Sequence, residues 1–574
     1  MTARVLFAIV AMSAAAFAQP QPPQPPAQQQ PARDTPSRTA ATPPAGRITG
    51  RVLAADNGHP IKRARVLVTA AELPGGRGVL TDDGGVFEIT ELPAGRYTVA
   101  ASKIGFVSLS YGQRRPLQAG TPLQLGDGQQ MKGVDFRLPR GSVVAGRLVD
   151  EDGEPMPGAT VGVMRYQYLQ GDRRLVSAGT AQTDDKGQFR VWGLMPGEYY
   201  VSGVARNFGF GPARGGFGGR GGFGGRGSFG GEDENVAYAP TYFPGVESVD
   251  QAKPITVGLS QEVLDINFSL RLVRTAHIEG RVLNPDGSGV SAGNVQLIAE
   301  SARTRGQIGV RYGSRIDWDG AFSIGNVPPG RYTLLARADD AEALEYGSQP
   351  VAVTGDDLPD VTVIVSPGAT ISGKVIFSPS PQPPDYTQVR VVASALEQGL
   401  EGPSQTRPDK DGTFMIRGVA AGPHLIRPQG QLRGWVLESV TVGGRDTTDT
   451  PIDLRARQNL ANVVVTFTDK ISQITGTLTN AQGSPLVEYT VLAFPTDSSL
   501  WRPQARQIMT ARPDQTGKYT IRGLPAGEYY LVAVDPAEQG EWFEPSYLDE
   551  HRAGAAHVTL SEGDAKTHDF KIGS

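Results

Sequence analysis

The chain has no cysteine among its 574 residues, and that absence excludes several kinds of chemistry. Without thiols there is no disulfide framework, no thiolate ligand for a metal, no cysteine nucleophile and no cysteine for lipid attachment. Histidine is also scarce, with six residues, and none is followed by Glu at the third position as zinc peptidases require. We therefore expect no cofactor, no metal site and no enzyme activity.

Charge of one sign and long apolar runs are lacking as well. The formal net charge is −4 with both signs dispersed, which argues against a nucleic-acid partner for the folded parts. After the N-terminal segment, no run is apolar and long enough to span a bilayer as a helix. The sequence thus predicts no nucleic-acid partner and no integral membrane segment in the mature chain.

The N-terminus has the pattern of an export signal. Arg4 precedes an apolar run that ends in Ala16-Phe17-Ala18, a small-residue cleavage site. This pattern predicts a signal peptide over residues 1–18 and a secreted, periplasmic or cell-surface protein. A buried strand or a short membrane anchor is the alternative. Residues 19–45 are rich in Pro and Gln and are expected to form a disordered linker.

Glycine and proline are abundant, at 73 and 44 residues, and a pattern built on glycine recurs five times. In each copy, an aromatic residue lies two positions after the first Gly and an aliphatic residue lies four positions after it. A second Gly comes ten residues after the first, and a Tyr usually lies two positions after that second Gly. The copies are Gly85/Phe87/Ile89/Gly95/Tyr97, Gly187/Phe189/Val191/Gly197/Tyr199, Gly320/Phe322/Ile324/Gly330/Tyr332, Gly412/Phe414/Ile416/Gly422/His424 and Gly517/Tyr519/Ile521/Gly527/Tyr529. A fixed internal period divides a chain into equivalent units.

Each copy is preceded by a strand pattern in which Gly lies between two aliphatic residues. The five sets are Ile48/Gly50/Val52, Val144/Gly146/Leu148, Ile278/Gly280/Val282, Ile371/Gly373/Val375 and Ile474/Gly476/Leu478. Alternate residues of a strand share one face, so each Gly is expected to make room for a bulky group from the facing sheet. These glycines recur about every hundred residues, with a longer second interval, which suits seven-strand sandwiches.

The spacing predicts an all-β protein, an elongated tandem array of five Ig-like β-sandwich domains. Turn pairs such as Asp319-Gly320 and Pro329-Gly330 separate the predicted strands, and an alternating strand such as Val361/Val363/Val365 closes each unit. The expected domains cover residues 46–140, 141–273, 274–367, 368–470 and 471–574, with a Gly/Arg/Phe-rich insertion at 206–234 in the second.

The combined pattern, D-x-x-G-x-F-x-I-x-x-L-P-A-G-x-Y after a G-x-V/L strand, resembles the carboxypeptidase regulatory-like domain. The resemblance implies a transthyretin-like β-sandwich within a wider carbohydrate-binding-like fold group, without the catalytic domain of the enzymes. It covers all five units. The fourth departs from the pattern, with Ala420-Ala421-Gly422 in place of the Pro-containing turn and His424 in place of the Tyr.

Two kinds of short motif resemble catalytic or metal-binding motifs, but their sequence context is more typical of turns. Gly289-Val290-Ser291-Ala292-Gly293 fits the pattern of a serine-hydrolase nucleophile, yet it follows an Asp-Gly turn and leads into a strand, whereas a nucleophile elbow leads into a helix. Asp-x-Asp-Gly strings begin at Asp150, Asp317 and Asp409 and lack the Glu of a calcium loop. Hairpin turns explain these strings, and a weak calcium site at one of them is the alternative.

The insertion at 206–234 places Arg214, Arg220 and Arg226 among Phe-Gly-Gly repeats. Such segments suggest RNA in a cytosolic protein, but export removes that partner. We expect a disordered cationic loop, with a specific anionic ligand such as envelope polysaccharide or extracellular DNA as the alternative.

Aromatic residues follow the Tyr strand in four of the five units and are the candidate ligand site. They are Tyr111, Tyr238, Tyr242, Phe243, Tyr346, Trp542, Phe543 and Tyr547. Aromatics in a polar loop can form a flat platform for sugar rings, and loops on a rigid sandwich are where binding residues usually lie. The alternative is a hydrophobic plug on the sandwich edge or a contact with the next unit.

Together these patterns predict a non-catalytic protein that binds or scaffolds at the cell envelope, with carbohydrate as its specific ligand. A structural spacer or adhesin that has protein partners and no small ligand is the alternative.

Overall fold

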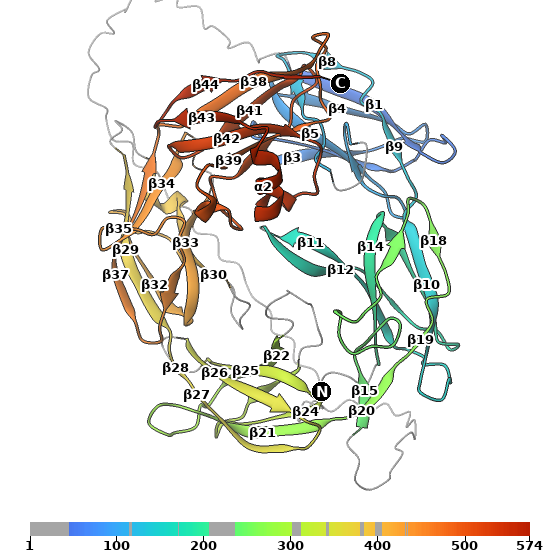
Figure 1. Ribbon diagram of the computed structural model, residues 1–574, viewed down its shortest axis with the longest axis vertical. Helices are drawn as coiled ribbons and strands as arrows, with labels where there is room; N and C mark the ends of the chain where they lie inside the picture. The colour runs from blue at the N-terminus through green and yellow to red at the C-terminus, as the bar shows by residue number, and fades with distance from the viewer. Residues whose placement is uncertain are drawn as a thin grey trace, which may run out of the picture. The chain divides into compact units, whose positions relative to one another are not determined.

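The computed structural model describes residues 45–113, 118–169, 171–205, 236–300, 312–339, 344–378, 384–396, 404–430, 432 and 434–573. The predicted signal peptide, nearly all of the linker and the insertion of the second unit lie outside these residues. What is described consists of β-strands with a few short helical segments (Figure 1).

The strands form pairs of sheets that follow one another along the chain. In the first unit, one sheet comprises β4 (Val86–Leu92), β1 (Gly46–Ala54), β8 (Gln130–Met131) and β9 (Phe136–Leu138), and the other β3 (Leu73–Leu80), β2 (Arg65–Ala70), β5 (Gly95–Ser102), β6 (Leu109–Ser110) and β7 (Leu123–Leu125). The second unit also has two sheets. One comprises β13 (Gln188–Leu194), β10 (Ser142–Val149), β18 (Glu262–Val263) and β19 (Phe268–Ser269). The other comprises β12 (Asp172–Gln182), β11 (Thr160–Leu169), β14 (Gly197–Val204), β16 (Thr241–Tyr242) and β17 (Ile255–Val257). A two-stranded sheet of β15 (Val236–Ala239) and β20 (Arg271–Arg274) accompanies the second unit.

The remaining units repeat this plan. In the third, β24 (Ala321–Val327), β21 (Ala276–Leu283) and β27 (Leu358–Ile364) face β23 (Tyr312–Ile316), β22 (Gly293–Ala299), β25 (Gly330–Ala338), β26 (Glu345–Val353) and β28 (Ser366–Pro367). In the fourth, one sheet comprises β32 (Thr413–Val419), β29 (Ala369–Phe377), β37 (Asn459–Thr468), β34 (Val436–Val442) and β35 (Arg445–Asp446). The other comprises β31 (Ser404–Thr406), β30 (Arg390–Ala395), β33 (Gly422–Gln429) and β36 (Ile452–Leu454). The short helix η1 (Tyr386–Gln388) precedes β30 in the sequence. In the fifth, β41 (Lys518–Arg522), β38 (Gln473–Asn480), β44 (Ala565–Thr567) and β45 (Phe570–Ile572) face β40 (Met509–Ala511), β39 (Thr490–Pro495), β42 (Gly527–Val534) and β43 (Ala556–Leu560). The fifth unit also carries η2 (Ser498–Leu500), η3 (Glu541–Phe543) and α2 (Pro545–Arg552).

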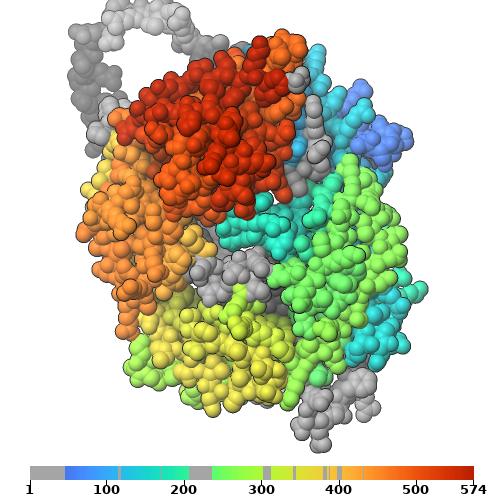
Figure 2. Space-filling model, viewed as in Figure 1, coloured from blue at the N-terminus to red at the C-terminus, as the bar shows by residue number. Residues whose placement is uncertain are grey.

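Each pair of sheets encloses its own hydrophobic core. Strand β1 alternates buried and outward-facing residues, the period-two pattern of a strand with one face on a core. Buried apolar side chains form one main cluster per pair of sheets within the described residues, and Figure 2 shows the outer surface of the atoms that enclose these clusters. The all-β sandwich fold is therefore confirmed, whereas the domain boundaries and the elongated array stay predictions.

The recurring strand glycines contact a backbone carbonyl rather than a bulky group from the facing sheet, which corrects the sequence expectation. At Gly50, Gly146, Gly280, Gly373 and Gly476, a side-chain carbon would overlap the carbonyl oxygen of Val134, Ile266, Val361, Val463 and His568, respectively. Each of these oxygens belongs to the segment that runs parallel to the glycine strand within the same sheet. The glycine is required because a carbonyl of this parallel neighbour occupies the place of a side chain at the same level in every unit.

The pairing between the parallel segment and the glycine strand is interrupted at the glycine. Strand β1 pairs with β8 before Gly50 and with β9 after it, and β38 pairs with β44 and then β45 around Gly476. The interruption leaves the next backbone N–H without a ladder partner, and an Asp side chain replaces that partner in the first and fifth units. The Arg51 N–H donates to Asp135 Oδ1 at 2.8 Å, and the Thr477 N–H donates to Asp569 Oδ1 at 2.8 Å.

The tyrosine of the repeat fixes the turn that precedes it. Its hydroxyl donates to the carbonyl oxygen four residues earlier in each of the four units that carry Tyr: Tyr97 to Pro93 (2.8 Å), Tyr199 to Met195 (2.6 Å), Tyr332 to Pro328 (3.0 Å) and Tyr529 to Pro525 (2.8 Å). Burial keeps these phenols neutral and raises the pKa of Tyr332 to about 12. In the fourth unit, His424 Nδ1 instead lies 2.9 Å from the Gly422 carbonyl oxygen.

Replacing Gly476 by Ala is expected to destabilise the fifth unit by at least about 2 kcal/mol, because a backbone segment must move to admit the methyl group. The matched control is Gly554→Ala in the same unit, since nothing lies near a side-chain carbon at Gly554. Scanning calorimetry of the full chain compares the two variants. An unchanged thermogram for Gly476→Ala would contradict the carbonyl contact.

Candidate functional site

The aromatic residues predicted to bind a ligand are attached to several separate cores. Tyr111 packs on the first core, where its ring meets Phe136 edge-on at 6.3 Å between centroids. Tyr346 is half-buried on β26 of the third unit. Neither ring is among the exposed large hydrophobic residues.

In the second unit the three predicted aromatics point to different surroundings. Tyr238 packs against the cores of the second and third units and donates its hydroxyl to Glu151 Oε2 at 2.8 Å. Desolvation, and then the Glu151 carboxylate, raises the pKa of Tyr238. Tyr242 is only 8% exposed within a small satellite cluster, whereas Phe243 packs edge-on against Phe268 of the main core.

In the fifth unit the structure brings the three predicted aromatics together, but on a second cluster of apolar side chains. Trp542 and Phe543 from η3 and Tyr547 from α2 all pack against this cluster, which includes Phe494 and Trp501. Burial raises the pKa of Tyr547 to about 12. These positions favour the plug or interdomain-packing interpretation, since a stacking platform needs an open ring face, and the ligand-binding role of the eight residues stays a prediction.

Sequence reasoning passed over two tryptophans that are open to solvent. Trp318 is 83% exposed and Trp192 is 57% exposed. Trp318 lies in one of the Asp-x-Asp-Gly strings that the sequence assigns to turns, and the signal that could have identified it is the aromatic residue between the two aspartates. An indole ring at a turn tip offers a flat face to a ligand.

The turn that carries Trp318 is held by backbone and side-chain bonds. The Gly320 N–H donates to the Asp317 carbonyl at 2.9 Å, and the Asp317 N–H donates to the Ala321 carbonyl at 2.8 Å. Asp319 also lies 3.4 Å from the Arg281 guanidinium. The ring therefore projects from a fixed support rather than from a long loop.

A second feature that the sequence did not predict is a group of charges where the fourth and fifth units meet. The Asp449 carboxylate accepts from Arg427 Nη2 at 3.0 Å, from Arg506 Nε at 3.0 Å and from Gln507 Nε2 at 2.6 Å. Arg506 also donates to the Leu437 carbonyl at 2.6 Å. Burial lowers the pKa of Arg427, and the nearby Asp449 carboxylate opposes that effect. One carboxylate thus holds residues of both units.

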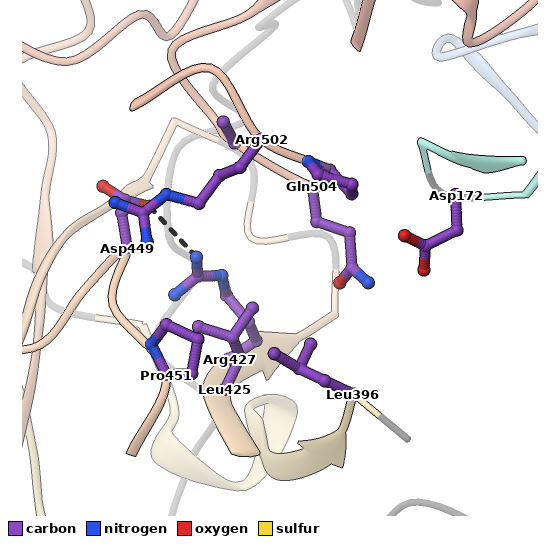
Figure 3. A pocket seen from close by; sticks show the side chains of 10 residues that line it. Asp172, Leu396, Leu425, Arg427, Asp449, Pro451, Arg502 and Gln504 are labelled. Atoms are coloured by element: carbon purple, nitrogen blue, oxygen red, sulfur yellow. Dashed lines mark hydrogen bonds and ion pairs between the residues drawn. The ribbon is translucent and has the colours of Figure 1, made fainter. Parts of the chain in front are cut away.

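A cavity of about 210 Å³ adjoins this group of charges. Figure 3 shows Arg502 reaching toward Asp449 and Arg427, with the Gln504 side chain and Asp172 on the other side of the space. Its lining is Asp172, Leu396, Leu425, Arg427, Asp449, Pro451, Arg502, Pro503, Gln504 and Ala505. The mixture of guanidinium groups and aliphatic surface suits a small polar ligand with an apolar face.

Within the described residues, no group of three or more His, Cys, Asp or Glu side chains is arranged to hold a metal ion. One carboxylate of each Asp-x-Asp-Gly string accepts a bond from its own turn, as Asp411 Oδ1 does from the Thr413 N–H at 3.0 Å. Ser291 lies just ahead of β22 with a strand after it, as the turn interpretation requires. Across all of the residues that the structure describes, no helix has the length and apolar character needed to cross a membrane.

Sequence comparison identifies the family at both ends of the folded chain. Residues 47–139 and 473–573 match the carboxypeptidase regulatory-like domain, which confirms the family predicted from the repeat. The match covers the first and last units only, so the family of the three units between them, and with it the five copies, stays a prediction. None of the curated proteins compared with the chain matches its sequence.

Structural comparison finds pilins and one other bacterial protein at low similarity. The Bacillus anthracis TIE protein is 10% identical, with 75% of this chain and 74% of that one covered and a TM-score of 0.15. GBS52, the minor pilin of Streptococcus agalactiae, is 13% identical over 40% of this chain and 96% of that one, with a TM-score of 0.22. BcpA, the major pilin subunit of Bacillus cereus, is 11% identical over 56% and 99%, with a TM-score of 0.13. Scores this low carry no information about function.

If Trp542 is a packing residue, Trp542→Ala should cost about 2 kcal/mol, somewhat less than the ~3–5 kcal/mol expected for a fully buried Trp. Trp318→Ala is the matched control and should change stability by less than about 0.5 kcal/mol, because its ring is exposed. Thermal unfolding of the full chain measures both. Equal stability of the two variants would show that Trp542 is not a plug and would return it to the ligand-binding interpretation.

Proposed function

We propose that the protein is an exported, non-catalytic scaffold of the cell envelope that binds carbohydrate. Support for export comes from the N-terminal pattern that ends in Ala16-Phe17-Ala18. Support for a binding or structural role comes from the carboxypeptidase regulatory-like segments and from the repeated sandwiches, which present turns on rigid frameworks.

The observation that carries the carbohydrate proposal is the exposure of Trp318. The Trp318 ring is 83% exposed, and its flat apolar face suits the C–H face of a sugar ring. The flanking carboxylates of Asp317 and Asp319 are acceptors for sugar hydroxyls. This site replaces the loop aromatics as the first place to look for the ligand.

A second candidate function is a structural spacer or adhesin that has protein partners and no small ligand. The bonds of Asp449 to Arg427 and Arg506 favour this candidate, because they tie two units together without any ligand. The two functions differ in whether polysaccharide is bound.

Retention of the full mature chain on insoluble polysaccharides tests the proposal. Trp318→Ala should weaken retention about tenfold, the equivalent of about 1.4 kcal/mol, whereas Trp318→Phe should keep part of it because a ring remains. Ile104→Ala is the matched control for general stickiness, since Ile104 is 84% exposed but has no ring. Failure of the wild type to bind any polymer would favour the spacer.

A further inference from the structure

The cavity where the fourth and fifth units meet has more arginine side chains than carboxylates at one end. Three guanidinium groups, those of Arg427, Arg502 and Arg506, lie around the single carboxylate of Asp449. Asp172, which also lines the cavity, has its own partner in Arg174 at 3.0 Å. Positive charge therefore exceeds negative charge at the Asp449 end of the cavity.

Arg502 is the arginine of this group whose hydrogen bonds are incomplete. Its Nε is buried and has no hydrogen-bond partner, although a buried guanidinium N–H is costly to leave unpaired. Arg427 and Arg506 already bond to Asp449, so Arg502 is the guanidinium with donors to spare. A ligand oxygen within the cavity would supply the missing acceptor.

The wall that carries Arg502 is fixed before any ligand arrives. Trp501, Ala505 and Ile508 are buried in the second apolar cluster of the fifth unit, and the Trp501 indole N–H donates to the Pro495 carbonyl at 2.8 Å. Between these anchors, Gln504 has a φ of 62°, a left-handed conformation that is uncommon for a residue other than glycine. Strained residues of this kind gather at binding sites, where the surrounding structure holds them.

Size and lining restrict the ligand further. A dry cavity of about 150 Å³ admits benzene, so a cavity of about 210 Å³ admits one six-membered ring with a substituent but not a chain of rings. Leu396, Leu425 and Pro451 provide apolar surface for a ring face, and Gln504 provides an amide for hydroxyl groups. A carboxylate matches a guanidinium in shape because both are planar and can form two parallel bonds.

We propose that this cavity binds a carboxylate-bearing sugar residue, with its carboxylate on Arg502 and its ring against the aliphatic wall. The proposal rests on the proposed carbohydrate function and narrows it to acidic sugars at this one site.

Calorimetric titration of the full chain with glucuronate and galacturonate tests the assignment, with glucose and galactose as neutral counterparts. The uronates should bind at least about tenfold more tightly than the neutral sugars, and Arg502→Gln should remove that difference. Arg502→Lys keeps the charge but loses the planar fork and should recover only part of it. Arg445→Gln, at an exposed arginine of the fourth unit, should bind as the wild type does.

Inorganic phosphate separates a sugar site from a general anion site. Phosphate that displaces uronate with equal or higher affinity would overturn the proposal, as would uronate binding that Arg502→Gln leaves unchanged. Polysaccharide retention is measured on the same samples. Retention without uronate binding overturns this inference alone, whereas loss of both also overturns the proposed function.

Discussion

A backbone carbonyl held against a residue with no side chain is the contact on which each sandwich depends. The Val134 carbonyl at Gly50 and the His568 carbonyl at Gly476 occupy the same place in their units. This contact lets the closing segment run parallel to the glycine strand, with its pairing broken at the glycine and resumed beyond it. The sheet then closes over the core, and the aromatic and tyrosine strands take fixed positions beside it.

The two proposed binding sites use side chains that the sandwich framework holds in position but that make no bonds needed for the fold. Trp318 projects from a turn whose bonds are all made by its neighbours. Arg502 lies on a wall anchored by buried side chains, next to a carboxylate already bonded to two other arginines. Both places combine a rigid support with a group that has binding capacity to spare, which is the arrangement expected of a binding site on a repeat scaffold.

Much of the fold was predictable because the strand signals are local. The spacing of Gly85 and Gly95 and the alternation of Ile48 and Val52 indicate strands and turns directly, and the structure has them. The partner of Gly50 was not predictable, because Val134 lies more than eighty residues away and a pattern says nothing about which group approaches. The cavity was hidden for the same reason, since Arg427, Asp449 and Arg502 come from distant segments and share no motif. The sequence could not decide between a packed and an open ring for the loop aromatics, because a Tyr or Trp in a polar loop has the same sequence pattern in both cases.

The central claim is that all five units are the same sandwich, including the three that lie between the segments matched by the family. Amide hydrogen exchange of the full chain tests this claim most directly, because protection reports the local stability of each strand pair. The account predicts five protected blocks, each containing the glycine strand and the aromatic strand that follows it, as in β29 with β32 of the fourth unit. Protection confined to residues 47–139 and 473–573, with rapid exchange between them, would contradict it.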